Sequence, residues 1–114
     1  MNIVDTSGWL EYLADTPRAD NYAPAIENTE ALLVPSIVLY EVFKKLSLAY
    51  DENRAFQAIG QLKQGRVLPA DEAIALYAGK ASIEKKLPMA DALIYATAIL
   101  HEATIFTQDA HFEG

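Results

Sequence analysis

The sequence predicts an α/β fold in which a mostly parallel central sheet carries helices on both faces. Four short apolar runs are each followed by a proline or by polar turn residues, as the strands of a small sheet would be, at residues 2–4, 31–34, 67–68 and 104–106. The stretches between these runs are long enough to form helices. Strands that alternate with helices imply right-handed crossovers and therefore a parallel sheet covered on both sides.

The first part of the chain should form a strand, a helix and a short helical piece. The strand at residues 2–4 is expected to end at Asp5, and Ser7 is placed to cap the helix that follows. A loop at residues 15–21 contains a proline and precedes a short helical piece at residues 22–29.

Two longer helices are expected in the middle of the chain. Pro35 should stop the second strand, and Ser36 then caps a helix over residues 37–50. Asp51 begins another helix, which runs to about residue 64. The apolar residues of this second helix that are predicted to face inward are Phe56, Ile59 and Leu62.

The last part of the chain should form two more helices before the final strand. Asp71 begins a helix after the very short third strand. Residues 87–100 are apolar nearly all round and have Pro88 in the first turn, so they predict a helix that is buried on most sides.

Length and composition are those of one globular domain, expected to span residues 1–114. Hydrophobic residues make up 52% of the sequence, enough to bury a core. No apolar run is long enough to cross a membrane, and the N-terminus lacks the layout of a secretory signal, so a cytoplasmic location is expected. The absence of cysteine excludes disulfides and thiolate metal sites.

The net charge of −7 repels a nucleic-acid backbone at long range and, taken alone, indicates a basic partner. Basic residues nevertheless cluster in two short helical segments, and they are Lys44, Lys45, Lys80, Lys85 and Lys86. These lysines could form a locally basic face, although ordinary solvated helix surfaces explain most of them more simply.

Four carboxylates are expected to meet at one edge of the sheet. Asp5 and Asp109 lie at the carboxyl ends of predicted strands, the edge at which ligands bind in open parallel sheets. Glu41 lies in the first turns of the helix that leaves the second strand, and Asp91 lies in the first turn of the apolar helix. A carboxylate in such apolar surroundings is costly unless it meets a donor, a positive charge or a metal ion.

A hard divalent cation is the natural partner of these acids, because carboxylates close together cannot all ionise without a counter-charge. Mg²⁺ prefers oxygen ligands and often serves substrate phosphates as well. A bound metal can activate water and stabilise a leaving oxygen, which is the chemistry of phosphodiester hydrolysis. Three hydroxyl groups near these acids could hold metal-bound water, namely those of Thr6, Ser7 and Thr107.

Each acid also has a simpler structural interpretation. Asp5 could form a turn, and Glu41 could pair with the lysines three and four residues on. Asp91 could complement the helix dipole, which is worth about 0.3–1 kcal/mol, and Asp109 could be a loop residue. The joint placement of the four favours a site. The two histidines, His101 near a helix end and His111 in a loop, are predicted not to be ligands.

Four segments, in order and over nearly the whole chain, resemble the PIN domains and, more narrowly, the VapC toxins of type II toxin–antitoxin systems. The segments are MNIVDTS (1–7), SIVLYEV (36–42), LPMADALIYATA (87–98) and TQDAHF (107–112). The resemblance implies a three-layer α/β/α PIN-like fold. It also implies a Mg²⁺- or Mn²⁺-dependent endoribonuclease.

The resemblance also assigns roles to residues and partners. Asp5 and Asp91 would be the most direct metal ligands, Asp109 a ligand or water holder, and Glu41 an orienting group or a ligand of a second metal. Family members usually form homodimers and are silenced by a basic antitoxin, which suits the charge of −7. The family normally adds one more strand after the Asp109 loop, whereas this sequence ends at Gly114, so either the sequence is cut short or this member has lost its last edge strand.

Other carboxylate sites on α/β folds fit less well. A response-regulator phosphoacceptor domain needs an Asp at the end of the third strand, where this chain has Val67, Leu68 and Pro69. A haloacid-dehalogenase-type phosphatase needs an Asp two residues after the first, where Ser7 stands. The alternative that stays open is a catalytically silent interaction module on a PIN scaffold, acting through dimer or partner binding.

Overall fold

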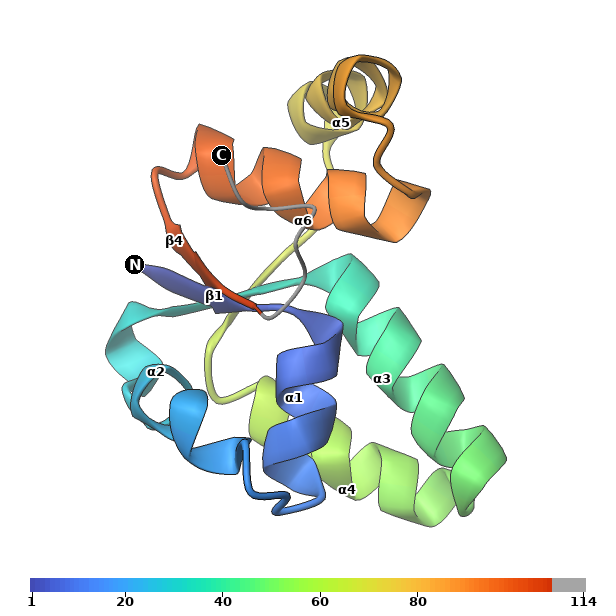
Figure 1. Cartoon of the computed structure of the whole chain (residues 1–114). Coiled ribbons are helices and arrows are strands. Elements are labelled where there is room, and N and C mark those ends of the chain that lie inside the picture. Colours follow the sequence, from blue (N-terminus) through green and yellow to red (C-terminus); the bar gives the residue numbers. More distant parts are fainter. Residues whose placement is uncertain (108–114) are drawn as a thin grey trace.

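The computed structural model describes residues 1–107 and contains a four-stranded, all-parallel sheet with helices on both sides (Figure 1). The strands are β1 (Asn2–Val4), β2 (Leu32–Pro35), β3 (Arg66–Leu68) and β4 (Thr104–Phe106). Their order is β3-β2-β1-β4, so β1 lies between β2 and β4. The predicted fold class and the four predicted strands are confirmed, with the difference that Pro35 belongs to β2 and pairs with Leu68.

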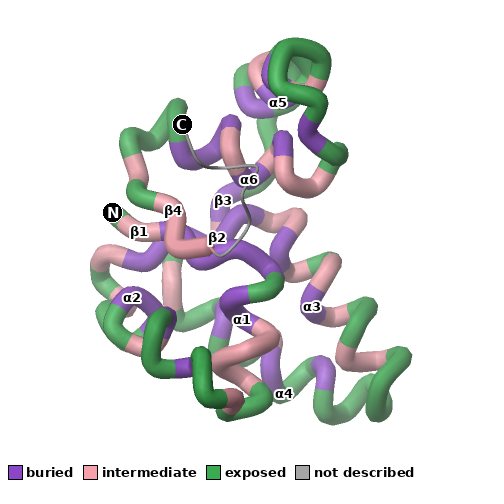
Figure 2. The backbone as a smooth tube through the Cα atoms, in the orientation of Figure 1, coloured by how far each residue is buried: buried purple, intermediate pink, exposed green. Residues whose placement is uncertain are grey.

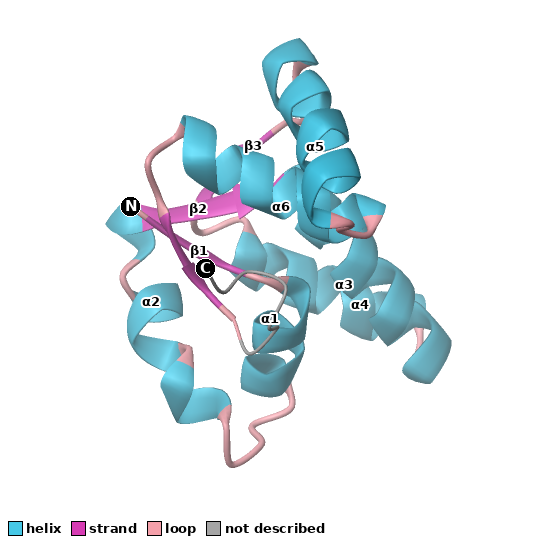
Figure 3. Cartoon of the chain, turned by 45° about the horizontal axis from the view of Figure 1, so that its top comes forward, coloured by secondary structure: helices cyan, strands magenta, loops and turns pink. Residues whose placement is uncertain are grey.

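The helices connect the strands in the expected sequence. They are α1 (Thr6–Leu13), α2 (Ala23–Glu27), α3 (Ser36–Ala49), α4 (Glu52–Leu62), α5 (Glu72–Lys85) and α6 (Met89–Leu100), with single 3₁₀ turns at Ala19–Asn21 and Thr29–Ala31. Helices α1 to α4 lie on one side of the sheet and α5 and α6 on the other (Figures 1 and 3). No helix within residues 1–107 has the length and apolarity that a membrane crossing requires.

Aspartates cap three of the helices, and two of these caps were predicted. Asp51 and Asp71 accept hydrogen bonds from the backbone N–H groups of Arg54 and Ile74, at 2.8 and 2.9 Å. The predicted cap at Ser7 is wrong, because α1 begins one residue earlier and Asp5 is its N-cap.

The predicted cap at Ser36 is also wrong. Ser36 is the first helical residue of α3, and the residue at the N-cap position is Pro35, which offers no side-chain acceptor. Pro35 has the extended backbone of a strand residue, so the chain passes from β2 into α3 without an intervening turn. The start of α3 is consequently fixed to the end of the sheet.

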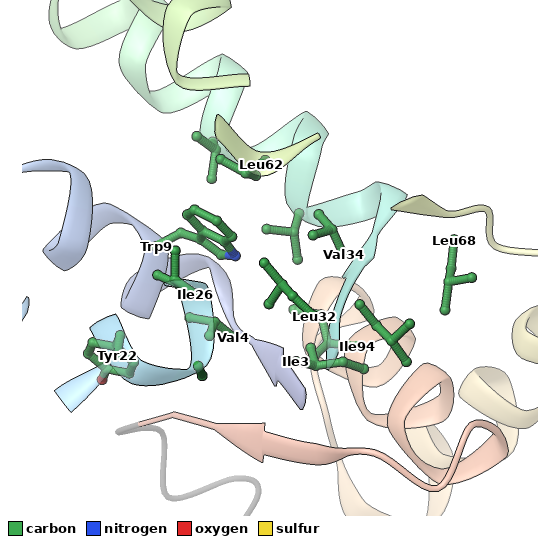
Figure 4. Close-up of a cluster of buried hydrophobic side chains, with 14 of the residues drawn as sticks. Ile3, Val4, Trp9, Tyr22, Ile26, Leu32, Val34, Leu62, Leu68 and Ile94 are labelled. Atoms are coloured by element: carbon green, nitrogen blue, oxygen red, sulfur yellow. The ribbon is translucent and has the colours of Figure 1, made fainter. Parts of the chain in front are cut away.

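The main core lies between the sheet and helices α1 to α4, and α6 closes it from the other side (Figure 2). Figure 4 shows Trp9 of α1, Ile26 of α2, Leu62 of α4 and Ile94 of α6 around the strand residues. Both neighbouring strands β1 and β2 have fully buried apolar side chains, as expected for a parallel sheet that is covered on both faces. A smaller cluster, formed by Ile74, Ala78, Leu87, Ala92 and Ala96, joins α5 to α6.

The prediction for the inward face of α4 is correct for Leu62, which is fully buried, and wrong for Phe56, which is 61% exposed. Small residues, Ala55 and Ala58, face the core in its place. Phe56 instead packs on Phe43 of α3, with the ring centroids 4.8 Å apart. The hairpin of α3 and α4 therefore carries an aromatic contact along its rim.

Candidate acidic active site

The residues that follow three neighbouring strands meet at one edge of the sheet. Because β1 pairs in parallel with both β2 and β4, the start of α1, the start of α3 and the residue after β4 are brought together. The first turns of α1, α3 and α6 all lie on the side of the molecule toward which the strands point (Figure 1). This is the edge where the sequence predicts a site.

Asp5 is a buried carboxylate of this edge with several hydrogen-bond partners. It is only 4% exposed. Its Oδ1 accepts the backbone N–H of Gly8 at 2.8 Å, and its Oδ2 accepts the hydroxyls of Ser7, at 3.1 Å, and of Thr107. The backbone N–H of Asp5 donates to the carbonyl of Phe106 at 3.3 Å, so β4 holds the same residue from the other side.

Gly8 allows α1 to start this close to the core. A Cβ atom at this position would lie 2.7 Å from the ring of Tyr22 and 2.7 Å from Cγ1 of Val4, a distance that real contacts do not reach. The missing side chain lets the first turn of α1 sit against β1 and α2. The position of the Asp5 carboxylate thus depends on this glycine.

Glu41 is joined to the same turn through Thr6. The hydroxyl of Thr6, which is 6% exposed, donates to Oε1 of Glu41 at 2.5 Å. Glu41 lies in the second turn of α3, and this bond connects it to the start of α1 across 35 residues of sequence. Lys44, one of the two lysines that could pair with Glu41 in the simpler interpretation, places its Nζ 5.7 Å from the centre of the Tyr40 ring.

Asp91 lies in the first turn of α6, as predicted, and is half-buried. Helix α6 packs on α3 as well as on β2 and β4. Among residues 1–107, no three histidine or acidic side chains are close enough together to hold a metal ion. The remaining predicted acid, Asp109, and also His111, lie outside the described residues. His101 is an exposed residue at the end of α6.

The far end of α1 is held by Tyr12. Its hydroxyl donates to Oε2 of Glu27 in α2 at 3.0 Å. Burial, together with this hydrogen bond and the charge of Glu27, raises the pKa of Tyr12 above its usual value. Tyr12 therefore stays protonated and a donor throughout the neutral range, which keeps α1 in a fixed position relative to α2.

The donors at this edge suit Mg²⁺ or Mn²⁺. They are carboxylate and hydroxyl oxygens, which hard divalent cations prefer. Oδ1 of Asp5 uses one acceptor position for Gly8, and a carboxylate oxygen can accept about two partners. The hydroxyls of Ser7 and Thr107 can rotate away from Oδ2 if a cation approaches. The residues present therefore fit the expected metal.

Comparison with known families agrees with this architecture. The profile of the PIN domain matches residues 3–114, nearly the entire chain. The chain belongs to the PIN-domain family. Members of this family are typically nucleases and generally depend on a metal ion. A comparison with curated proteins finds no significant match.

Solved structures place this PIN domain among the VapC-like toxin folds. A toxin–antitoxin complex from Klebsiella pneumoniae contains a chain with 25% identity and a TM-score of 0.80, covering 100% of this chain and 92% of that one. VapBC2 from Rickettsia felis, bound to a DNA fragment of its promoter, matches with 19% identity and a TM-score of 0.78, covering 98% and 90%. VapC20 from Mycobacterium tuberculosis, a Sarcin–Ricin loop cleaving toxin, matches with 18% identity and a TM-score of 0.76, covering 96% and 92%.

The structure brings together more of the site than the carboxylates alone. Thr6, Ser7 and Thr107 were expected as holders of water, and here they donate to the acids directly. The bond between Thr6 and Glu41 and the close approach at Gly8 were not anticipated. The sequence carries no signal for either feature, because both contacts arise only when separate elements of the chain pack together.

Proposed function

We propose that this PIN domain is a metal-dependent endoribonuclease toxin of a toxin–antitoxin pair, which hydrolyses phosphodiester bonds of RNA. The observation that carries the proposal is the buried carboxylate of Asp5, held by three donors at the edge where α1, α3 and α6 begin. Capping of α1 accounts for the contact of Oδ1 with Gly8, and the two further hydroxyls that meet Oδ2 at the edge where α3 and α6 also begin support a role as a ligand. The likeness to VapC20, which cleaves the Sarcin–Ricin loop, supports RNA as the substrate.

In this proposal each side chain has a separate task. Asp5 and Asp91 hold Mg²⁺ or Mn²⁺ most directly, and Asp109 completes the ligand set or holds a water. Glu41, oriented by Thr6, positions water or a second ion. Ser7 and Thr107, whose hydroxyls lie beside Oδ2 of Asp5, turn to hold a metal-bound water. The ion, when bound, would lower the pKa of water and stabilise the leaving oxygen.

The proposed partners are a basic antitoxin and a second copy of the chain. The related Klebsiella and Rickettsia toxins were crystallised in complexes with their antitoxins. The net charge of −7 favours a basic partner, since complementary charge speeds association and fixes orientation. An RNA substrate places the proposed activity in the cytoplasm.

A second candidate is a catalytically silent PIN scaffold that acts through dimer or partner binding. It is favoured by one observation, namely that Asp5 is the N-cap of α1 and that both of its carboxylate oxygens already accept hydrogen bonds within the chain. The two candidates differ in whether the purified protein binds Mn²⁺ and cleaves RNA.

The proposal is tested with the purified protein and single-stranded RNA. Cleavage should need Mn²⁺ or Mg²⁺ and stop with a chelator. Asp5→Asn and Asp91→Asn should each abolish cleavage and weaken Mn²⁺ binding in isothermal titration calorimetry. Asp20→Asn, at an exposed aspartate of the Ala19–Asn21 turn, is the matched control and should change neither. If the parent protein binds no Mn²⁺ and leaves RNA intact, the silent scaffold is the correct reading.

A further inference from the structure

We propose that Tyr40 and Lys44 form a platform on which one nucleotide of the RNA substrate stacks, next to the phosphate that is cleaved. The two residues lie one turn apart on α3, and the Lys44 Nζ is 5.7 Å from the centre of the Tyr40 ring. This inference rests on the proposed ribonuclease function and adds the residues that would bind its substrate.

The pair is placed beside the acidic site by the chain itself. Tyr40 directly precedes Glu41, which is tied to the start of α1 by Thr6. Consecutive Cα atoms are about 3.8 Å apart, and successive side chains of a helix point about 100° apart. Tyr40 therefore lies one residue from Glu41, on the face of α3 next to the one through which Glu41 reaches the start of α1.

Residue Tyr40 is 57% exposed, although tyrosine often packs its ring in a core or an interface. Tyr40 is therefore not a core residue, unlike Trp9, which is completely buried. An ammonium group over an exposed ring is weakly attracted to it and keeps the ring in place. A base can stack on the part of the ring that the ammonium leaves open, and every base has a face suited to such stacking.

The charge of α3 makes it a suitable approach for a phosphate backbone. Helix α3 contains two lysines, Lys44 and Lys45, and one acid, Glu41, in a chain whose net charge is −7. Both lysines are exposed. RNA that approaches the acidic edge along α3 thus meets two local positive charges, which oppose the repulsion between the phosphates and the negative net charge of the chain. An aromatic ring with adjacent cations is the combination that binds single-stranded nucleic acid.

The junction of α3 and α4 supplies a control pair. Tyr50, at the end of α3, is 59% exposed, and the guanidinium of Arg54 lies 5.1 Å from its ring centre. Tyr50 and Arg54 therefore repeat the chemistry of Tyr40 and Lys44. Tyr50 follows Glu41 by nine residues, which is about 13 Å along a helix. The two pairs differ in their position relative to the acidic edge and in their cation, which is an arginine of α4 in the second pair.

The test measures RNA binding separately from cleavage, by fluorescence anisotropy of a labelled single-stranded oligoribonucleotide with chelator present. Tyr40→Ala should weaken binding about 5- to 150-fold, since stacking on an aromatic ring is worth about 1–3 kcal/mol per base. Tyr40→Trp should retain parent-like affinity because it keeps a stacking surface. Lys44→Ala should reduce the slope of log affinity against log salt by about 0.7, the value for one phosphate on a single strand. Tyr50→Ala and Arg54→Ala should change neither quantity.

The inference is overturned if Tyr40→Ala binds RNA as tightly as the parent, or if Tyr50→Ala weakens binding equally. It is also overturned if Tyr40→Ala changes only the oligomeric state in light scattering, because the ring would then belong to an interface between copies of the chain. Cleavage by the parent with Mn²⁺ is measured in parallel. Cleavage with no effect of Tyr40→Ala contradicts the platform alone, whereas a parent that neither binds nor cleaves RNA contradicts the ribonuclease function as well.

Discussion

Asp5 combines two roles that mutations can separate. Its carboxylate caps α1 and is also the proposed metal ligand. Asparagine caps a helix as well as aspartate does, but it is a poorer ligand for a hard cation because it carries no charge. The amide of asparagine also leaves the neighbouring hydroxyls able to turn and accept.

Asp5→Asn should therefore keep the free energy of unfolding close to that of the parent while removing Mn²⁺ binding. Asp5→Ala should lose both, with a cost of about 0.5–2 kcal/mol for the missing cap. Denaturant unfolding and titration calorimetry measure the two effects. Equal destabilisation by both variants would mean that the charge of Asp5, and not its capping bond, stabilises the fold.

The sequence predicts the positions of the candidate acids in the fold better than their contacts. Asp5, Glu41 and Asp91 lie where the strand and helix pattern places them. The cap was wrongly assigned to Ser7, because Asp and Ser cap helices equally well and the choice depends on where the first turn closes. The link from Thr6 to Glu41 spans 35 residues and arises only when β1 and β2 pair, so no local pattern could reveal it.

At the scale of elements, two helices carry glycines that stability does not require. Gly60 of α4 and Gly79 of α5 are interior helical residues, and a Cβ at either position would meet nothing within 4 Å. Gly60→Ala and Gly79→Ala should each raise the free energy of unfolding by about 0.5–1 kcal/mol, because alanine restricts the unfolded chain and favours the helix. Thermal and denaturant unfolding measure this gain. A loss at either site would indicate that another chain packs against that glycine.

Gly8→Ala is the opposite case. The added methyl group would overlap the Tyr22 ring and Val4, each 2.7 Å away, so the first turn of α1 must shift. A destabilisation of about 1–3 kcal/mol is expected, as for other overpacked positions. Because the shift moves Asp5, Mn²⁺ affinity should fall together with stability, whereas Gly60→Ala leaves it unchanged. Unaltered Mn²⁺ binding in Gly8→Ala would show that the ligand does not depend on this turn.

Elements were predictable where short-range signals agree with packing. Asp51 and Asp71 were identified as caps because each precedes a helical pattern, and the four apolar runs became strands. Phe56 was wrongly placed inside because its apolar character is a stronger signal than the alanines beside it. The small side chains of Ala55 and Ala58 occupy the interior face of α4, and the larger ring of Phe56 lies at the rim, where it contacts Phe43 of α3.

At the scale of the whole molecule, the site depends on sheet order. The ends of β1, β2 and β4 lie side by side because β1 lies between β2 and β4 in the order β3-β2-β1-β4, and this brings the start of α1, with Asp5, next to the start of α3. The pattern of strands and helices predicts parallel pairing, but it does not specify which strands are neighbours. The topology therefore turns a set of separated motifs into one edge with Asp5 at its centre.

The net charge of −7 and the proposed metal site predict two distinguishable effects of ions on the stability of the whole chain. Raising NaCl from about 0.01 to 0.15 M shortens the screening length from about 30 to 8 Å, which relieves self-repulsion and should raise the melting temperature of parent and variants alike. Mn²⁺ at constant ionic strength should add a saturable increment, since a ligand that binds only the folded state stabilises it by about 2.7 kcal/mol at 100 times its dissociation constant. Asp5→Asn should keep the first effect and lose the second in differential scanning calorimetry. If Mn²⁺ stabilises Asp5→Asn as much as the parent, the ion acts through general charge screening, and the acidic edge is not its binding site.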